Sequence, residues 1–210
     1  MPSGGSVFNP ISHIDNSIIM PLDTIISDYT QNLTNSLATF DWKPVETLAE
    51  DLTNIWNTPS TVFFCGNGGS AANANHLAND FIYGIAPKYG KGLKVHSLSA
   101  NSAVMTCLGN DIGYEAIYEK QLNTLAKKGD ILITFSGSGN SENIVRAIEL
   151  AKDRGVKTHA ILGFDGGKCK SLADNAIHLD LNDMQISEDF QMIIGHILMK
   201  YLTENEKKVS

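Results

Sequence analysis

Five short apolar runs, separated by stretches with helical spacing, constrain the fold of this 210-residue chain more than any other feature. The runs predict strands at 61–65, 94–98, 131–135, 158–162 and 176–180. Helices are expected between and after them at 70–83, 102–108, 114–127, 142–154, 168–173 and 188–202. Strands that alternate with helices pair in parallel, and a parallel sheet needs helices on both faces. The sequence therefore predicts an α/β fold, a three-layer αβα sandwich around a five-stranded parallel sheet of the doubly wound type.

The chain before the first strand predicts two further helices. Apolar residues recur with helical spacing from 16 to 37, with Pro21 near the helix start, and a second helix is expected at 44–56. Residues 1–15 are rich in Ser, Gly, Pro and Asn without apolar periodicity, which is typical of a flexible arm. A single domain is then expected over 16–210, because this length suits one hydrophobic core.

Charge, hydropathy and cysteine content narrow the class of protein. The net charge is −7 and no dense Lys/Arg cluster occurs, which argues against nucleic-acid binding. No run reaches the roughly 18 apolar residues that a membrane helix needs. Cys65, Cys107 and Cys169 are odd in number and scattered, so they form neither a zinc-knuckle spacing nor a disulfide framework. We expect a cytoplasmic protein with no membrane or nucleic-acid partner.

The loop 136–141, Ser-Gly-Ser-Gly-Asn-Ser, joins a predicted strand to a predicted helix. Glycines let the backbone approach an anion, and a helix N-terminus offers unpaired N–H groups. The hydroxyls of Ser136, Ser138 and Ser141 can donate to phosphate oxygens. The alternative is a flexible loop in which Ser141 merely caps the helix. The position between strand and helix favours a phosphate cradle.

A second glycine-rich loop, Gly-Asn-Gly-Gly-Ser-Ala at 66–71, formally matches the dinucleotide-binding pattern G-x-G-x-x-A. That pattern also requires an acidic residue at the end of the next strand, to hold a ribose. The strand at 94–99 reads Lys-Val-His-Ser-Leu-Ser and has no carboxylate. A P-loop is excluded too, because no Gly-Lys-Ser/Thr follows. We expect no nucleotide cofactor.

Both loops follow strands of one parallel sheet, so they lie at the same sheet edge, where such folds bind ligands. Asn67 and Ser70 suit sugar hydroxyls, while the serine loop suits a phosphate. Two such loops can grip one small ligand, and the sequence predicts a sugar phosphate.

Titratable side chains are expected near this edge. His76 and Asp80 are four residues apart and share a helix face, where they can enter the site or simply hydrogen-bond to each other. Asn110 and Asp111 follow an apolar segment and can bind hydroxyls or form a turn.

The last predicted helix carries His196 among apolar residues and Glu188 near its start. His196 is either a site residue or a core histidine. Glu188 can have a purely structural role, in which its negative charge interacts favourably with the dipole at the helix N-terminus. Eight residues separate the two, about 80° on an ideal helix, so they converge only if the first turn is distorted or the site lies above the helix start. His76, Asp80, Glu188 and His196 form a nitrogen and oxygen set from which three or four ligands could hold zinc.

Several of these motifs together resemble the phosphoheptose isomerases, members of the sugar isomerase (SIS) superfamily. The likeness rests on the loop 66–70 followed by His76, on the serine loop 136–141, on the turn 163–168 and on His196. The resemblance implies a flavodoxin-like sheet, N-terminal helices that pack a homotetramer, and active sites at subunit interfaces. It also implies conversion of sedoheptulose 7-phosphate to D-glycero-D-manno-heptose 7-phosphate.

The resemblance also implies roles for individual residues. Substrate contacts are implied for Asn67, Gly68, Gly69, Asn110 and Asp111, and phosphate contacts for Ser136, Ser138 and Ser141. His196 matches the family's catalytic histidine, and His76 matches a zinc ligand found in part of the family. One zinc ion per subunit is then expected.

Two positions depart from the family's pattern. Asp80 stands where the family has a glutamate that binds metal and is a candidate base, and Glu188 stands where a glutamine is common. Proton transfer needs a reach of about 2.6–3.2 Å, and aspartate is one methylene shorter than glutamate. Either Glu188 or Asp80 can be the base of a cis-enediol mechanism, with His196 as the acid or partner base. A non-catalytic adaptor that binds a sugar phosphate or a replication initiator is the alternative.

Overall fold

The computed structural model describes residues 19–86 and 90–209, so the predicted arm at 1–15 lies outside the described residues. Five parallel strands form one sheet in the order β2-β1-β3-β4-β5. The strands are β1 (Val62–Gly66), β2 (Val95–Ser97), β3 (Ile131–Ser136), β4 (Lys157–Leu162) and β5 (Asn175–His178). This is the flavodoxin-like order, in which the connection direction reverses between β1 and β3. The predicted fold class is confirmed.

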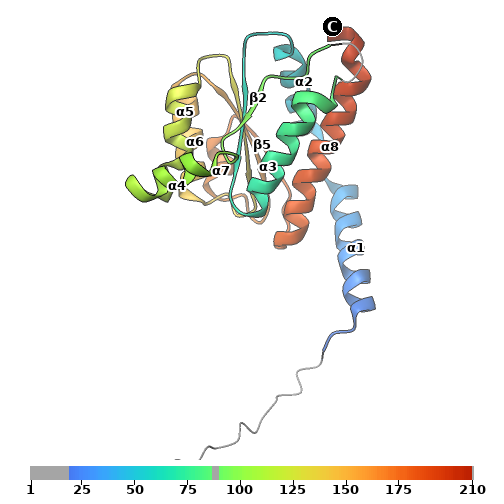
Figure 1. Ribbon diagram of the computed structural model, residues 1–210. Helices are drawn as coiled ribbons and strands as arrows, with labels where there is room; N and C mark the ends of the chain where they lie inside the picture. The colour runs from blue at the N-terminus through green and yellow to red at the C-terminus, as the bar shows by residue number, and fades with distance from the viewer. Residues whose placement is uncertain (1–18, 87–89, 210) are drawn as a thin grey trace, which may run out of the picture.

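Helices cover both faces of the sheet (Figure 1). The helices are α1 (Leu22–Thr39), α2 (Lys43–Ile55), α3 (Gly69–Asn79), α4 (Ser102–Asp111), α5 (Ile117–Leu125), α6 (Glu142–Asp153), α7 (Gly167–Leu172) and α8 (Met184–Val209). A π-helical turn, η1 (Asp80–Gly84), extends α3, and a 3-10 turn, η2 (Tyr114–Ala116), precedes α5.

Alternation along the strands divides the core into two halves. Val62 and Phe64 face the side covered by α2, α3 and α8, whereas Phe63 and Cys65 face the side covered by α5, α6 and α7. Successive side chains of a strand point to opposite faces, so a sheet buried on both sides shows apolar residues at every position. This explains why the five runs are continuously apolar.

The last helix begins earlier than the sequence suggested. The prediction placed its start at 188, but α8 begins at Met184. The Asp183 carboxylate accepts a hydrogen bond from the Ile186 N–H at 3.0 Å, which is the usual service of an aspartate at a helix N-terminus. Glu188 therefore lies one turn inside the helix. Asp183, and not Glu188, caps the helix N-terminus.

The N-terminal half of α1 projects from the rest of the domain (Figure 1). Its later part packs on the core through Tyr29, Leu33 and Leu37. Leu22 and Ile26, by contrast, are 69% and 55% exposed. An apolar stripe of this kind on a monomer usually marks a contact with another protein surface. None of the helices in the part of the chain described is long and apolar enough to cross a membrane.

Candidate active site

A polar pocket of about 300 Å³ lies where β1 and β3 end, at the switch point of the sheet. Two segments form most of its wall: 67–70, which leads from β1 into the start of α3, and 136–141, which leads from the end of β3 to α6. Phe135, Met184 and Glu188 complete it. Open α/β sheets bind ligands at this place, because the strand order reverses there and the loops on the two sides diverge and leave a crevice between them. The expectation that the two loops meet at one edge is confirmed.

The serine loop has the geometry of an anion cradle. The Gly139 N–H donates to Ser136 Oγ at 3.0 Å, which folds the loop back on itself. Ser141 is the residue before α6 and makes no side-chain capping bond, so its hydroxyl is not committed to the helix. The first N–H groups of α6 and the positive end of its dipole favour an anion. Among the residues described, no lysine or arginine lines this pocket.

Gly139 must be glycine for two reasons. Its φ of 63° lies in the left-handed region, and a Cβ atom there would overlap the backbone carbonyl of Gly166. The serine loop thus packs directly on the turn before α7, where the Cys169 N–H donates to Gly139 O at 3.0 Å. The turn at 163–168, noted in the sequence, supports the cradle rather than lining the pocket.

The carboxylate of Glu188 enters the pocket beside Gly69, which has no side chain to block it. Asn73 fixes this arrangement by donating to the Glu188 backbone carbonyl and to Gln191 Oε1, both at 3.0 Å. The Gln191 amide in turn donates to Ser70 Oγ at 3.0 Å. Ser70 is therefore a buried link between α3 and α8, while Glu188 is the pocket's ionisable side chain among the residues described.

His76, Asp80 and His196 form a separate cluster on the same side of the sheet. The Nε2 atoms of the two histidines are 3.3 Å apart, and they lie 3.4 and 3.6 Å from Asp80 Oδ2. The Asp80 side chain is only 13% exposed, whereas each imidazole is about half exposed. The i,i+4 spacing thus joins His76 to Asp80 as predicted, and packing of α8 on α3 adds His196.

This cluster fits a zinc ion by its spacing as well as its chemistry. Zinc binds imidazole nitrogen and carboxylate oxygen at about 2.0–2.2 Å, so two ligands of a tetrahedron are roughly 3.4 Å apart. The three observed separations lie close to that value. The carboxylate of Glu188 does not belong to this group of ligand atoms. A three-ligand site leaves one position open, as catalytic zinc sites do.

Asn110 and Asp111 lie elsewhere. They end α4, are exposed, and hydrogen-bond to each other at 2.7 Å. Neither lines the polar pocket of this chain. Their implied contact with substrate therefore stays a prediction.

Sequence reasoning missed four polar residues that shape the site: Asn73, Tyr114, Asn143 and Gln191. Each lies on a helix or helical turn, at a position where the sequence pattern predicts only an exposed helix face or the middle of a helix. Their partners are 47 to 121 residues away along the chain, so no local spacing marks them.

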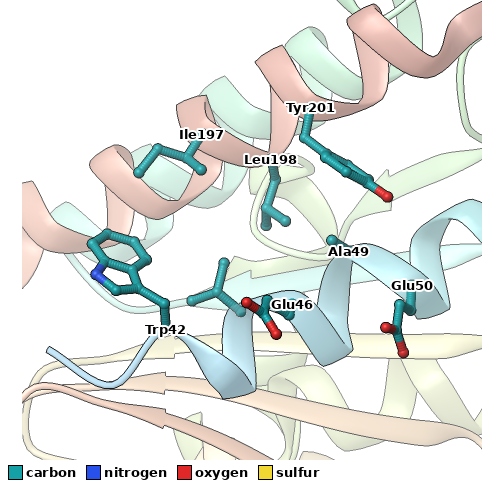
Figure 2. A pocket seen from close by; sticks show the side chains of 8 residues that line it. Trp42, Glu46, Ala49, Glu50, Ile197, Leu198 and Tyr201 are labelled. Carbon is teal, nitrogen blue, oxygen red and sulfur yellow. The ribbon is translucent and has the colours of Figure 1, made fainter.

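A second pocket of about 390 Å³ lies between α2 and α8 and has a different character (Figure 2). Trp42, Ile197, Leu198 and Tyr201 give it apolar walls, and Glu46 and Glu50 lie along one side. Its described lining includes two carboxylates and no lysine, arginine or serine. The polar pocket at the switch point is therefore the better candidate for a phosphate site.

Comparison with known proteins identifies the family of this chain. The SIS domain family matches residues 28–163. The phosphoheptose isomerase of Nitratiruptor sp. is 42% identical over 144 residues, which cover 69% of this chain and 76% of that protein. The phosphoheptose isomerase of Helicobacter pylori strain Shi470 is 42% identical over 137 residues, 65% of this chain and 71% of the relative. The structure of phosphoheptose isomerase from Neisseria gonorrhoeae matches the fold with a TM-score of 0.80 and 24% identity, over 88% of this chain and all of the other.

The fold and the polar switch-point pocket thus define an α/β protein of the SIS class. The chain belongs to the SIS-domain family and, within it, to the phosphoheptose isomerases. It is accordingly an enzyme of the isomerase class.

Proposed function

We propose that this enzyme interconverts a ketose phosphate and an aldose phosphate, with sedoheptulose 7-phosphate and D-glycero-D-manno-heptose 7-phosphate as its substrate and product. The observation that carries the proposal is the polar pocket, in which a phosphate cradle and one carboxylate face the same space. The names of the relatives support the heptose phosphate. The serine hydroxyls and the start of α6 would hold the phosphate, and the loop 67–70 would hold the sugar.

Glu188 is the base in this proposal. It takes a proton from the carbon beside the ketose carbonyl, the C–H electron pair forms the C=C bond of a cis-enediol, and the carbonyl oxygen gains a proton. Return of a proton to the former carbonyl carbon, with loss of the proton from the hydroxyl on the neighbouring carbon, gives the aldose. Asp80 is a poorer candidate, because its Oδ2 lies 3.4 and 3.6 Å from the two histidine Nε2 atoms and is engaged by them. Glu188 reaches into the pocket from α8 without such partners among the described ion pairs.

His76, Asp80 and His196 would hold a divalent ion, and zinc suits the two imidazoles and one carboxylate. When bound, the ion supplies a Lewis acid that stabilises negative charge on substrate oxygens. We propose that His196 takes part in the reaction through this centre, as a ligand, because its Nε2 lies at ligand spacing from both partners. Without metal, the same nitrogen can carry the proton that the oxygens of the enediol need.

The functional unit in this proposal is a homotetramer in the cytoplasm. Support for self-association comes from the exposed apolar side chains of α1 and from α4, in which no residue is buried. Asn110 and Asp111, at the end of α4, would then meet a pocket of a neighbouring subunit. The three cysteines are free, which suits a reducing compartment.

The test is isomerisation of sedoheptulose 7-phosphate, followed by NMR in D₂O. The wild-type enzyme should form the aldose phosphate and exchange the proton next to the carbonyl. The Glu188→Gln variant keeps the shape of the side chain but loses the base, so kcat should fall about 10²–10⁴-fold. A non-catalytic adaptor would show no exchange above background. Near wild-type rates in both Glu188→Gln and His196→Ala would overturn the assignment of these residues.

A further inference from the structure

A pair of asparagines links the two loops of the polar pocket, and the proposed reaction steps make no use of it. Asn67 Nδ2 donates to Asn143 Oδ1, and Asn143 Nδ2 donates to Asn67 Oδ1, both at 2.9 Å. Asn67 belongs to the sugar-facing loop, whereas Asn143 lies in the first turn of α6, two residues after Ser141 of the cradle. Two antiparallel hydrogen bonds fix the orientation of the partners as well as their distance. Asn143 is 2% exposed, so water does not compete for it.

Two tyrosines hold the same loop from another direction. The Tyr114 hydroxyl donates to Asn67 Oδ1 at 2.9 Å. The Tyr118 hydroxyl donates to the Gly66 carbonyl. Burial raises the pKa of Tyr118, so its hydroxyl stays protonated and remains a donor at neutral pH. The loop is therefore tied to α6, η2 and α5 at once.

Counting the hydrogen bonds of Asn67 shows what it can still offer a ligand. A carboxamide has two N–H donors and an oxygen with two lone pairs. Asn143 and Tyr114 each donate to the oxygen at 2.9 Å, the Tyr118 hydroxyl lies 3.4 Å from it, and Asn143 accepts from one of the two N–H groups. One N–H remains, and its direction is set by the pair. A free asparagine, in contrast, could turn its amide either way and offer a donor or an acceptor.

We propose that Asn143 is a positioning residue that acts through Asn67. The pair sets the separation between the sugar-facing loop and the phosphate cradle, and with it the length of sugar phosphate that reaches Glu188 in register. This inference rests on the proposed function for the class of ligand. A misplacement of about 1 Å can cost a large factor in rate, so the pair affects kcat without touching the reacting atoms.

A binding cycle tests this proposal with Asn143→Ala, Asn67→Ala and the double variant. Titration calorimetry measures Kd for inorganic phosphate and for sedoheptulose 7-phosphate. Asn143→Ala should leave the phosphate Kd within about twofold and raise the sugar phosphate Kd about tenfold, because the cradle persists while the sugar-facing donor turns away. The double variant should bind the sugar phosphate no more weakly than Asn67→Ala alone. Losses that add, or equal weakening of both ligands, would overturn the role of the pair.

A milder variant keeps the test valid if Asn143→Ala does not fold. Tyr114→Phe removes one hydroxyl from a side chain that is 57% exposed, so it opens no core cavity. It should raise the sugar phosphate Kd about threefold, and this effect should vanish in the Asn67→Ala background. Tyr201→Phe, at an exposed tyrosine in the α2–α8 groove, is the matched control and should change nothing. An effect of Tyr114→Phe that persists without Asn67 would contradict the proposal.

The outcomes separate this inference from the proposed reaction. A wild-type enzyme that binds sedoheptulose 7-phosphate more tightly than phosphate but does not isomerise it rejects the reaction, and the binding cycle still decides the role of Asn143. A wild-type enzyme that binds the sugar phosphate no better than inorganic phosphate overturns both.

Discussion

The carboxylate of Glu188 occupies the space that a Cβ atom on Gly69 would need. One residue is at the start of α3 and the other one turn inside α8, so the absence of a side chain on the first creates the seat for the second. The hydrogen bonds of Asn73 to the Glu188 carbonyl and to Gln191 hold the two helices at this distance. This chain thus presents a carboxylate to the polar pocket, at the position where the resemblance implied a glutamine.

A methyl group on Gly69 should displace that carboxylate. We expect Gly69→Ala to lower kcat at least tenfold with a smaller change in the Kd for inorganic phosphate, since the serine loop is untouched. Steady-state kinetics and phosphate titration check this. Glu149→Ala is the control, because it truncates an exposed side chain in the middle of α6, outside the lining of the polar pocket. It should keep full activity. Equal kcat in both variants would contradict the claim that Gly69 makes room for the Glu188 carboxylate.

We expect the histidine cluster to bind zinc. The melting temperature and the zinc content of the protein test this without a measurement of activity. Zinc that binds only the native state raises Tm, and the chelated protein should melt lower than the zinc-loaded one. His76→Ala and His196→Ala should each abolish this shift and the zinc content measured by atomic absorption. His96→Ala, at an exposed histidine outside the cluster, should retain both. Full zinc content in His76→Ala would show that the ion lies elsewhere.

Acid should weaken the partly buried contacts of Asp51, in α2, with Lys157 and His159 of β4. Burial pushes the pKa of Asp51 up, but His159 and Lys157 outweigh it, and the net pKa is lowered from 3.8. Lys157 Nζ lies 2.6 Å from the Asp51 carboxylate and His159 Nε2 lies 3.1 Å from it. A lowered pKa adds stability that is complete above the unfolded value, near pH 4, and is lost as pH falls through the folded value.

The variant Asp51→Asn should therefore unfold about 1–3 kcal/mol more easily than the wild type at pH 7, because His159 is fully buried and loses its carboxylate. The difference should shrink as pH falls below about 4. Urea denaturation at pH 7, 5 and 3.5 measures it. A difference that stays constant over this range would exclude the ion pair as its cause.

The apolar stripe of α1 should hold subunits together. Leu22→Asp with Ile26→Asp places two charges among exposed apolar side chains, and we expect the oligomer to dissociate. Light scattering after size-exclusion chromatography reports the mass. Gln31→Glu adds a charge at an exposed polar position of the same helix and should leave the assembly intact. A monomeric wild-type protein would contradict the proposed homotetramer.

Local patterns sufficed for much of the fold and for both ligand loops. Continuous apolar runs such as 131–135 predict buried parallel strands, and the chain order of strands and helices leaves few ways to wind them. The loops at 67–70 and 136–141 then had to meet, because both follow strands of one parallel sheet. The helix boundaries were harder to predict. The helix α8 begins at Met184 because Asp183 caps it, but several polar residues nearby in the sequence could equally well have been the cap.

By itself, the sequence determined the sheet, its two-sided burial and the edge at which the two glycine-rich loops meet, since these depend on periodicity and on the order of elements along the chain. Only the tertiary structure decided which carboxylate faces the pocket and which joins the histidines. His76 and His196 are 120 residues apart, and their meeting depends on how α8 packs on α3. That packing results from many weak side-chain contacts at once. No spacing in the sequence could therefore assign Glu188 to the polar pocket and Asp80 to the histidine cluster.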